Sequence, residues 1–158
     1  MKNFNLPKLV AAILICEAAG IIGSVFTVSS IPTWYATLAK PSFTPPNWIF
    51  GPVWITLYFL MGVALYLVWL KGLKSKKTRQ ALLIFAMQLF LNAAWSIVFF
   101  GRHSPFGGLV IIILLWVLIL MSLLRFWGID KPAGLLLMPY LVWVSLALVL
   151  NFFVWKLN

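Results

Sequence analysis

Residues 34–58 read WYATLAKPSFTPPNWIFGPVWITLY, the only long stretch in which prolines, aromatics and hydroxyl groups interrupt an otherwise apolar chain. Pro41, Pro45 and Pro46 each restrict a backbone φ angle, so the first half of this stretch is expected to be a stiff loop. Pro45 and Pro46 directly precede Asn47, which favours the start of a helix there. Because loops on a rigid scaffold often carry function, this loop and the helix after it are the first candidates for a functional site.

The rest of the chain has the composition of an integral membrane protein. Of its 158 residues 64% are hydrophobic and 9% are charged, and the mean hydropathy is +1.07, whereas soluble domains carry about 25% charged residues. The net charge of +10 could indicate nucleic-acid binding. However, the basic residues lie between apolar runs, where such charges orient membrane helices. We therefore expect the lipid bilayer, and no nucleic acid, as a partner.

Five apolar runs are long enough to cross the membrane, since about 20 apolar residues span about 30 Å of hydrocarbon. They cover approximately residues 8–29, 47–70, 80–101, 106–127 and 133–155. The predicted fold class is therefore an all-α integral membrane protein, a bundle of five transmembrane helices in a single domain that covers 1–158. The first run has no small-residue cleavage site after a short apolar core, so we interpret it as the first transmembrane helix and not as a removable signal peptide.

The distribution of Lys and Arg predicts the orientation of this bundle, because these residues accumulate in short cytoplasmic loops. With five spans, the N-terminus shares one side of the membrane with the second and fourth connections. That side holds nine basic residues: Lys2, Lys8, Lys71, Lys74, Lys76, Lys77, Arg79, Arg125 and Lys131. The other side holds three: Lys40, Arg102 and Lys156. We expect the N-terminus in the cytoplasm, and the first loop and the C-terminus outside.

Polar, small and aromatic residues recur three or four positions apart in four of the five predicted helices, so each set shares one helix face. The sets are Glu17, Gly20, Ser24 and Thr27; Gly51, Trp54, Tyr58 and Met61; Gln88, Asn92, Trp95 and Phe99; and Tyr140, Trp143, Ala147 and Asn151. Polar side chains in transmembrane helices usually face the bundle interior. We expect these four helices to converge on a common space, and the fourth helix, which is almost wholly apolar between Leu109 and Met121, to act as scaffold.

Two interpretations of this common space stay open. It is either a pocket for a large, flat, mostly apolar ligand, or a packed core in which interhelical hydrogen bonds contribute about 0.6–2 kcal/mol each. Pro52 and Pro139 lie within the second and fifth predicted helices, where each is expected to kink its helix and so to favour a cavity. Cys16 is the only cysteine, which excludes an intrachain disulfide and a cysteine-based metal site, and no metal ligands are predicted.

Three groups of residues together match a known pattern. They are Trp34, Tyr35, residues 40–46, residues 51–54, Leu57 and Tyr58; Gln88, Leu89, Leu91, Asn92, Trp95 and residues 99–101; and residues 139–143, Ala147, Leu150, Asn151, Val154 and Trp155. This combination resembles the translocator protein family (TspO/MBR, peripheral benzodiazepine receptor), in particular its bacterial-type members, over nearly the whole chain. The resemblance implies a bacterial cell membrane, often a homodimer, and a structured Pro-rich first loop capping a pocket.

The resemblance also implies what the pocket binds. Family members bind porphyrins, haem and synthetic benzodiazepine-site ligands, and some degrade protoporphyrin in a reaction that needs light and oxygen. By motif, the tryptophans tied to that reaction correspond to Trp54 and Trp143. The ligand-binding residues implied for this chain are Tyr35, Pro45, Trp54, Tyr58, Gln88, Asn92, Trp95, Tyr140, Trp143, Ala147 and Asn151. No cofactor is required, since a porphyrin or haem is the ligand, and we expect Lys40 and Arg102 to pair with its carboxylates.

One departure from the family concerns sterols. Phe152 lies between Leu150 and Lys156, where the animal sterol motif has a tyrosine, and this weighs against high-affinity sterol binding. The function predicted is that of a membrane receptor for tetrapyrroles and similar flat apolar ligands, acting in tetrapyrrole regulation or a stress response. Two alternatives stay open: a light- and oxygen-dependent porphyrin-degrading enzyme, and a porphyrin or sterol transporter, although no internal repeat of the kind common in transporters is visible.

Overall fold

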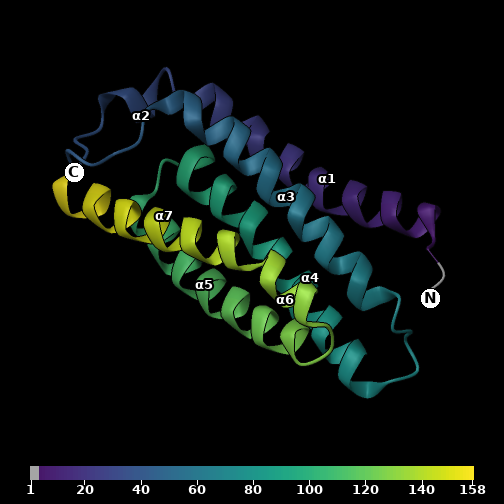
Figure 1. The fold of residues 1–158 in the computed structure, drawn as a ribbon. Coiled ribbons are helices and arrows are strands. Elements are labelled where there is room, and N and C mark those ends of the chain that lie inside the picture. Colours follow the sequence, from purple (N-terminus) through teal and green to yellow (C-terminus); the bar gives the residue numbers. More distant parts are fainter. Residues whose placement is uncertain (1–3) are drawn as a thin grey trace.

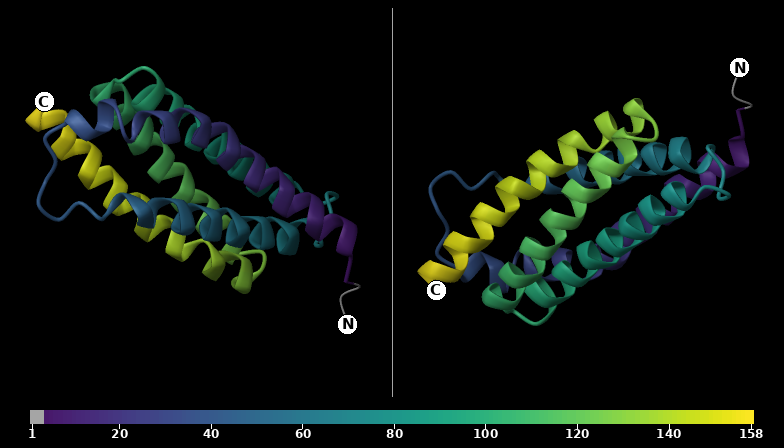
Figure 2. Two further views of the ribbon diagram at one scale, coloured as in Figure 1. Left: turned by 90° about the horizontal axis from the view of Figure 1, so that it is seen from above. Right: turned by 90° about the horizontal axis from the view of Figure 1, so that it is seen from below.

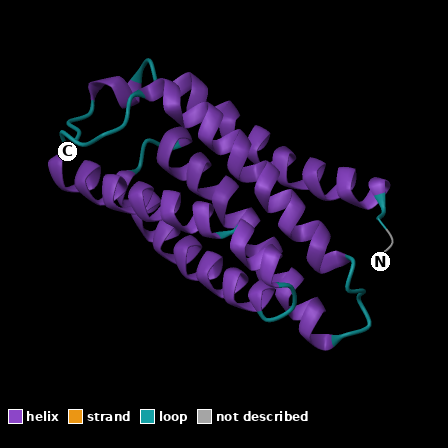
Figure 3. Cartoon of the chain, viewed as in Figure 1, coloured by secondary structure: helices purple, strands orange, loops and turns teal. Residues whose placement is uncertain are grey.

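The computed structural model describes residues 4–158, and this part of the chain forms helices and loops without strands (Figure 3). Five helical segments are long and apolar enough to cross a membrane: Leu6–Ser30, Asn47–Trp69, Lys76–Gly101, Pro105–Trp127 and Lys131–Leu157. Each overlaps one of the five predicted spans, so the all-α class and the five-helix membrane bundle are confirmed. Lys2, which was counted among the predicted cytoplasmic charges, lies outside the described residues.

The elements along the chain are α1 (Leu6–Ser30), α2 (Trp34–Thr37), α3 (Asn47–Trp69), α4 (Lys76–Ser96), η1 (Ile97–Gly101), α5 (Pro105–Trp127), α6 (Lys131–Leu136) and α7 (Met138–Leu157). Short polar side chains start two of the membrane helices. The Asn5 side chain accepts a hydrogen bond from the Lys8 backbone N–H at 3.0 Å, and the Ser104 hydroxyl accepts one from the Gly107 N–H at 3.1 Å. Both bonds satisfy N–H groups that a helix start leaves unpaired.

Two features inside the spans differ from simple α-helices. The third span ends in the π-helical turn η1, in which the Arg102 N–H bonds to the Ile97 carbonyl at 2.9 Å. The fifth span is interrupted at Leu137, between α6 and α7. Pro139, which was expected to kink this span, lies two residues after the interruption, in the first turn of α7. A proline has no N–H for the preceding turn and is tolerated at a helix start.

The long helices run side by side along one common direction, and the two termini lie at opposite ends of the molecule (Figure 1). The N-terminal end of α1, the α3–α4 loop and the α5–α6 turn share one end. The first loop, the turn after η1 and the C-terminus share the other (Figures 1 and 2). This arrangement separates the two predicted groups of basic residues, while the side of the membrane that each faces stays a prediction.

The core lies between α3, α4, α5 and α7, and α5 contributes its buried face to it. Phe85 of α4 and Phe126 of α5 stack with ring centroids 5.2 Å apart. α1 packs on α3 and α4 at the edge of the bundle, and α3 packs mainly against α1 and α6. At the contact between α1 and α3, a Cβ atom on Gly62 would lie 2.6 Å from the Ile13 Cα, so only glycine allows the two backbones to approach this closely.

Candidate ligand-binding cavity

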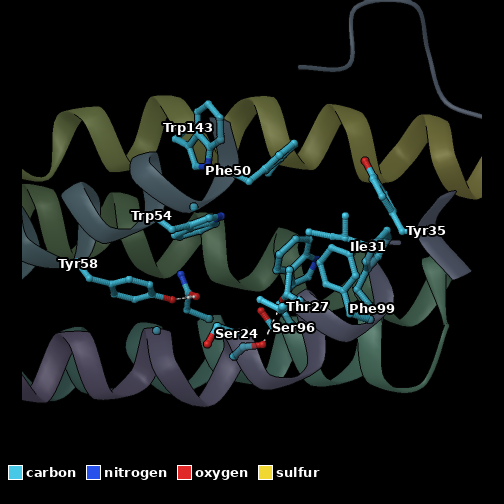
Figure 4. Close-up of a pocket in the computed structure, with 18 of the residues that line it drawn as sticks. Ser24, Thr27, Ile31, Tyr35, Phe50, Trp54, Tyr58, Ser96, Phe99 and Trp143 are labelled. Atoms are coloured by element: carbon cyan, nitrogen blue, oxygen red, sulfur yellow. Dashed lines mark hydrogen bonds between the residues drawn. The ribbon is translucent and has the colours of Figure 1, made fainter. Parts of the chain in front are cut away.

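A cavity of about 410 Å³ lies between α1, α3, α4, η1 and α7, at the end of the bundle that the first loop covers (Figure 4). Its volume falls within the range of small-molecule sites, about 300–1,000 Å³. The lining residues are Glu17, Gly20, Ile21, Gly23, Ser24, Thr27, Val28, Ile31, Tyr35, Asn47, Phe50, Gly51, Trp54, Ile55, Tyr58, Asn92, Trp95, Ser96, Phe99, Phe100, Trp143, Ala147, Leu150, Asn151 and Val154. Within the described chain none of them comes from α5, in agreement with the scaffold role predicted for that helix.

Most of the predicted ligand-binding residues line this cavity. They are Tyr35, Trp54, Tyr58, Asn92, Trp95, Trp143, Ala147 and Asn151. Pro45, Gln88 and Tyr140 are not among the lining residues. The helical periodicity therefore identified the inward faces, but it did not separate the side chains that form the wall from those that lie behind it.

Gln88 and Tyr140 lie behind the wall in a buried chain of hydrogen bonds. The Tyr58 hydroxyl donates to Asn92 Oδ1 at 2.6 Å (Figure 4), and Asn92 Nδ2 donates to the Tyr140 hydroxyl at 2.6 Å. The Tyr140 hydroxyl in turn donates to Gln88 Oε1 at 2.8 Å. Gln88 and Tyr140 are each 1% exposed. They are placed to hold Asn92 and Tyr58 in position, and not to touch a ligand themselves.

A second set of hydrogen bonds orients the wall on the side of η1. Trp95 Nε1 donates to Asn151 Oδ1 at 3.0 Å, and Asn151 Nδ2 donates to the Pro105 carbonyl at 2.8 Å. The Trp95 ring also stacks on Phe99, with centroids 5.4 Å apart and an angle of 21° between the planes. These contacts join α4, η1, α7 and the start of α5, so a flat aromatic surface is held rigidly in the cavity wall.

Aromatic rings from α3 and α7 form the opposite wall, where Trp143, Phe50 and Trp54 lie near one another (Figure 4). Trp54 stacks on Tyr58 with centroids 5.6 Å apart, and Phe50 meets Trp143 edge to face at 5.8 Å. Trp143 Nε1 is buried and has no hydrogen-bond partner among the described residues. A buried donor of this kind is costly unless it finds an acceptor.

Tyr35, from the segment between α1 and α3, forms the cavity wall at the end of the bundle that holds the C-terminus (Figure 1). Tyr35 of α2 is 7% exposed and packs against Phe99 and Phe100. Burial raises the pKa of the Tyr35 phenol above its ordinary value, so this side chain stays uncharged. Trp34, next to it, stacks on His103 with ring centroids 4.6 Å apart. The segment between α1 and α3 thus contributes Ile31 and Tyr35 to the cavity lining, while the cap formed by its Pro-rich part stays a prediction.

The two predicted carboxylate-pairing residues do not line the cavity. Lys40 Nζ donates to the backbone carbonyls of Tyr35, at 2.7 Å, and of Leu38, at 2.9 Å, and lies 4.7 Å from the centre of the Tyr35 ring. Its ammonium group thus folds the loop onto α2. Arg102 is exposed in the turn after η1. Pairing of either residue with a ligand carboxylate stays a prediction.

Several wall residues were missed by the sequence analysis. Leu150 and Val154 lie three or four positions from Ala147 and Asn151 on the same face of α7, so the periodicity could have included them. Phe100 lies eight positions after Asn92 and follows the same spacing, although the π-helical turn η1 in which it lies was not predicted. Such turns recur at functional sites in helical proteins, but they cannot be predicted from a period of 3.6 residues.

Comparison with known proteins gives a consistent result over nearly the full length of the chain. The sequence model of the TspO/MBR family matches residues 12–156. The "Tryptophan-rich protein TspO" of Chlorobaculum tepidum is 46% identical over 156 residues, which cover 99% of each chain. That of Archaeoglobus fulgidus is 47% identical over 154 residues, or 98% of this chain and 99% of its own. The "Tryptophan-rich sensory protein" of Cereibacter sphaeroides is 37% identical over 156 residues, or 99% and 94%.

Proposed function

The chain belongs to the TspO/MBR family and is an integral, multi-pass membrane protein, and from this premise we propose that it is a receptor for tetrapyrroles such as protoporphyrin or haem, or for similar flat apolar molecules. The observation that carries the proposal is the aromatic cavity of about 410 Å³ inside the membrane bundle. A flat conjugated ligand gains most of its binding free energy by stacking on aromatic rings, and the cavity walls supply such rings from several helices. The name "Tryptophan-rich sensory protein" of one relative supports a role in sensing, and so in tetrapyrrole regulation or a stress response.

The few polar groups of the cavity support a ligand with a small number of polar atoms. The Tyr58 proton is already donated to Asn92, so at this point the wall presents chiefly acceptor capacity. Ser24 and Thr27 donate their hydroxyl protons to carbonyls of their own helix. A ligand with a large apolar face and few polar atoms meets these requirements with little desolvation cost.

A second candidate function, porphyrin breakdown driven by light and oxygen, is favoured by one observation: the indoles of Trp54 and Trp143 line the same cavity. In this case the excited porphyrin and oxygen would supply the reactivity, and the indoles would act as electron donors to the bound ligand. No residue outside the cavity is needed for this chemistry. We propose it as an activity of the same site and not as a separate one.

One experiment tests both functions. Purified protein in nanodiscs is titrated with protoporphyrin in the dark and then illuminated, with absorbance and mass spectrometry as readouts. We expect saturable binding at one site. Trp54→Phe and Trp143→Phe should lose at most about 1–2 kcal/mol of affinity, because phenylalanine keeps a stacking face but lacks the indole N–H. Trp127→Phe, at the opposite end of the bundle, is the matched control and should change nothing.

The outcomes separate the two functions. Absence of saturable binding in the dark would contradict the receptor. A product that needs protein, light and oxygen, and that decreases sharply in Trp54→Phe and Trp143→Phe while binding persists, supports the enzyme. If binding and product formation decrease in equal proportion in both variants, the two tryptophans only hold the ligand, and the enzymatic candidate is wrong.

A further inference from the structure

The cavity is exposed on one side, and that side lies between α1 and α3. Six of the lining residues have exposed side chains or backbone: Ile21, Ser24, Val28, Asn47, Gly51 and Ile55. Three belong to α1 and three to α3, whereas every lining residue from α4, η1 and α7 is buried or half-buried. The apolar members of this set are 65% (Ile21), 68% (Val28) and 62% (Ile55) exposed. The cavity therefore opens sideways.

The opening exists because α1 and α3 touch in one half of their length and separate in the other. Near the middle of both helices a Cβ atom on Gly20 would overlap the Tyr58 ring, and closer to the N-terminal end of α1 one on Gly62 would meet the backbone of α1. In the outer half, a Cβ atom on Gly51 would meet nothing within 4 Å. The left view of Figure 2 shows the two helices converging toward the N-terminal end and diverging toward the first loop.

This opening lies at the depth of the hydrocarbon. Ile21 precedes the last residue of α1 by nine positions, and Ile55 follows the first residue of α3 by eight. At 1.5 Å per residue these side chains lie about 12–14 Å below the outer helix ends. The hydrocarbon core is about 30 Å thick, so this position corresponds to its outer half. With the helix ends at the surface of the hydrocarbon, lipid tails and not water would surround this part of the opening.

The outer end of the cavity, by contrast, is fastened. The Asn158 side chain accepts a hydrogen bond from the Ala39 N–H at 3.0 Å and donates one to the Ala39 carbonyl at 3.1 Å, which ties the loop to the end of α7. Phe43 of the loop packs edge to face on Phe153 of α7, with centroids 5.7 Å apart. Lys40 adds two further bonds within the loop. A path through the loop would have to break all of these contacts.

We propose that the opening between α1 and α3 is a lateral portal through which a flat apolar ligand passes between the bilayer and the cavity. The proposal rests on the proposed function, since it takes the ligand to be the same tetrapyrrole-like molecule. Ile21, Val28 and Ile55 form an apolar rim, and Gly51 leaves the space between them free. Asn47 is the first residue of α3. Polar groups of the ligand can stay at headgroup level beside it while the apolar face of the ligand enters the cavity.

Reversible cross-linking tests the route. Cysteines replace Ser24 and Gly51 across the portal, or Ala39 and Asn158 across the loop contact as the matched control, in a Cys16→Ala background. Each pair is joined by a short reducible bifunctional reagent, and stopped-flow fluorescence follows protoporphyrin uptake from vesicles and its release. The portal cross-link should slow uptake and release at least tenfold, and reduction should restore both. The loop cross-link should change either rate by less than twofold. The reverse pattern would overturn the portal.

A second measurement needs no porphyrin. A nitroxide attached to Ile55→Cys should collide readily with oxygen, which dissolves in the bilayer, and rarely with a water-soluble nickel chelate. Frequent collisions with the nickel chelate would place the opening in water. Protection from both oxygen and the nickel chelate would mean that a second copy of the chain covers the opening. Either result overturns the proposal. If the nitroxide lies in lipid but the protein binds no porphyrin, the proposed function fails and the lateral opening stands.

Discussion

Replacing Tyr140 by phenylalanine tests the interpretation that the buried hydrogen-bond chain supports the cavity wall. The change removes one hydroxyl from a side chain that is 1% exposed and keeps the ring that packs edge to face on Trp54. Two hydrogen bonds are lost, one accepted from Asn92 at 2.6 Å and one donated to Gln88 at 2.8 Å. Both amide groups are then left in an apolar interior without this partner.

The expected cost follows from these two bonds. Interhelical hydrogen bonds in membrane proteins contribute about 0.6 kcal/mol each on average and up to about 1.7 kcal/mol. Tyr140→Phe should therefore lower the free energy of unfolding by about 1–3 kcal/mol. Tyr66→Phe is the matched control, because the Tyr66 hydroxyl accepts a single bond from the Asn5 N–H near the end of the bundle, where water can replace it. Its cost should stay below about 1 kcal/mol.

The assay is equilibrium unfolding in mixed micelles, followed by far-UV circular dichroism, with protoporphyrin affinity measured on the folded variants. Tyr140 does not line the cavity, so its replacement should change the affinity by less than about threefold while the stability falls. An affinity loss larger than that of Trp54→Phe, with unchanged stability, would mean that Tyr140 touches the ligand. The distinction between wall and supporting residues would then be wrong.

Two further predictions concern helix packing and orientation. Gly62→Ala should destabilise the protein by about 1–3 kcal/mol, because its methyl group would meet the α1 backbone at 2.6 Å. Gly51→Ala is the control: a Cβ atom there has nothing within 4 Å, so this change should be neutral or stabilising by up to about 1 kcal/mol. Equal unfolding midpoints of the two variants would contradict the close contact at Gly62. In intact spheroplasts, an impermeant thiol reagent should label Thr37→Cys and not Ser75→Cys, because Lys and Arg are concentrated on the side that holds Ser75. Labelling of Ser75→Cys alone would reverse the orientation.

The sequence by itself determined the class of the protein, its five spans and the faces that point inward. These are local properties: a run of about 20 apolar residues needs no knowledge of its partners to be recognised as a membrane span. Likewise, Trp54, Asn92 and Trp143 could be assigned to inward faces because helical periodicity depends only on spacing along the chain. The stiff, proline-rich loop was predictable for the same reason, since a proline restricts its own φ angle.

Only the tertiary structure decided how deep each inward residue lies and where the cavity opens. Tyr140 shares a helix face with Trp143, yet it ends behind the wall, because Asn92 from another helix lies in front of its hydroxyl. The lateral opening depends on where α1 and α3 meet, and this is set by side-chain volumes on both helices. Gly20 and Gly62 allow the close contact, because a Cβ atom at either position would overlap the other helix. Periodicity gives a direction for each side chain, but the distance between two helices is a property of the pair.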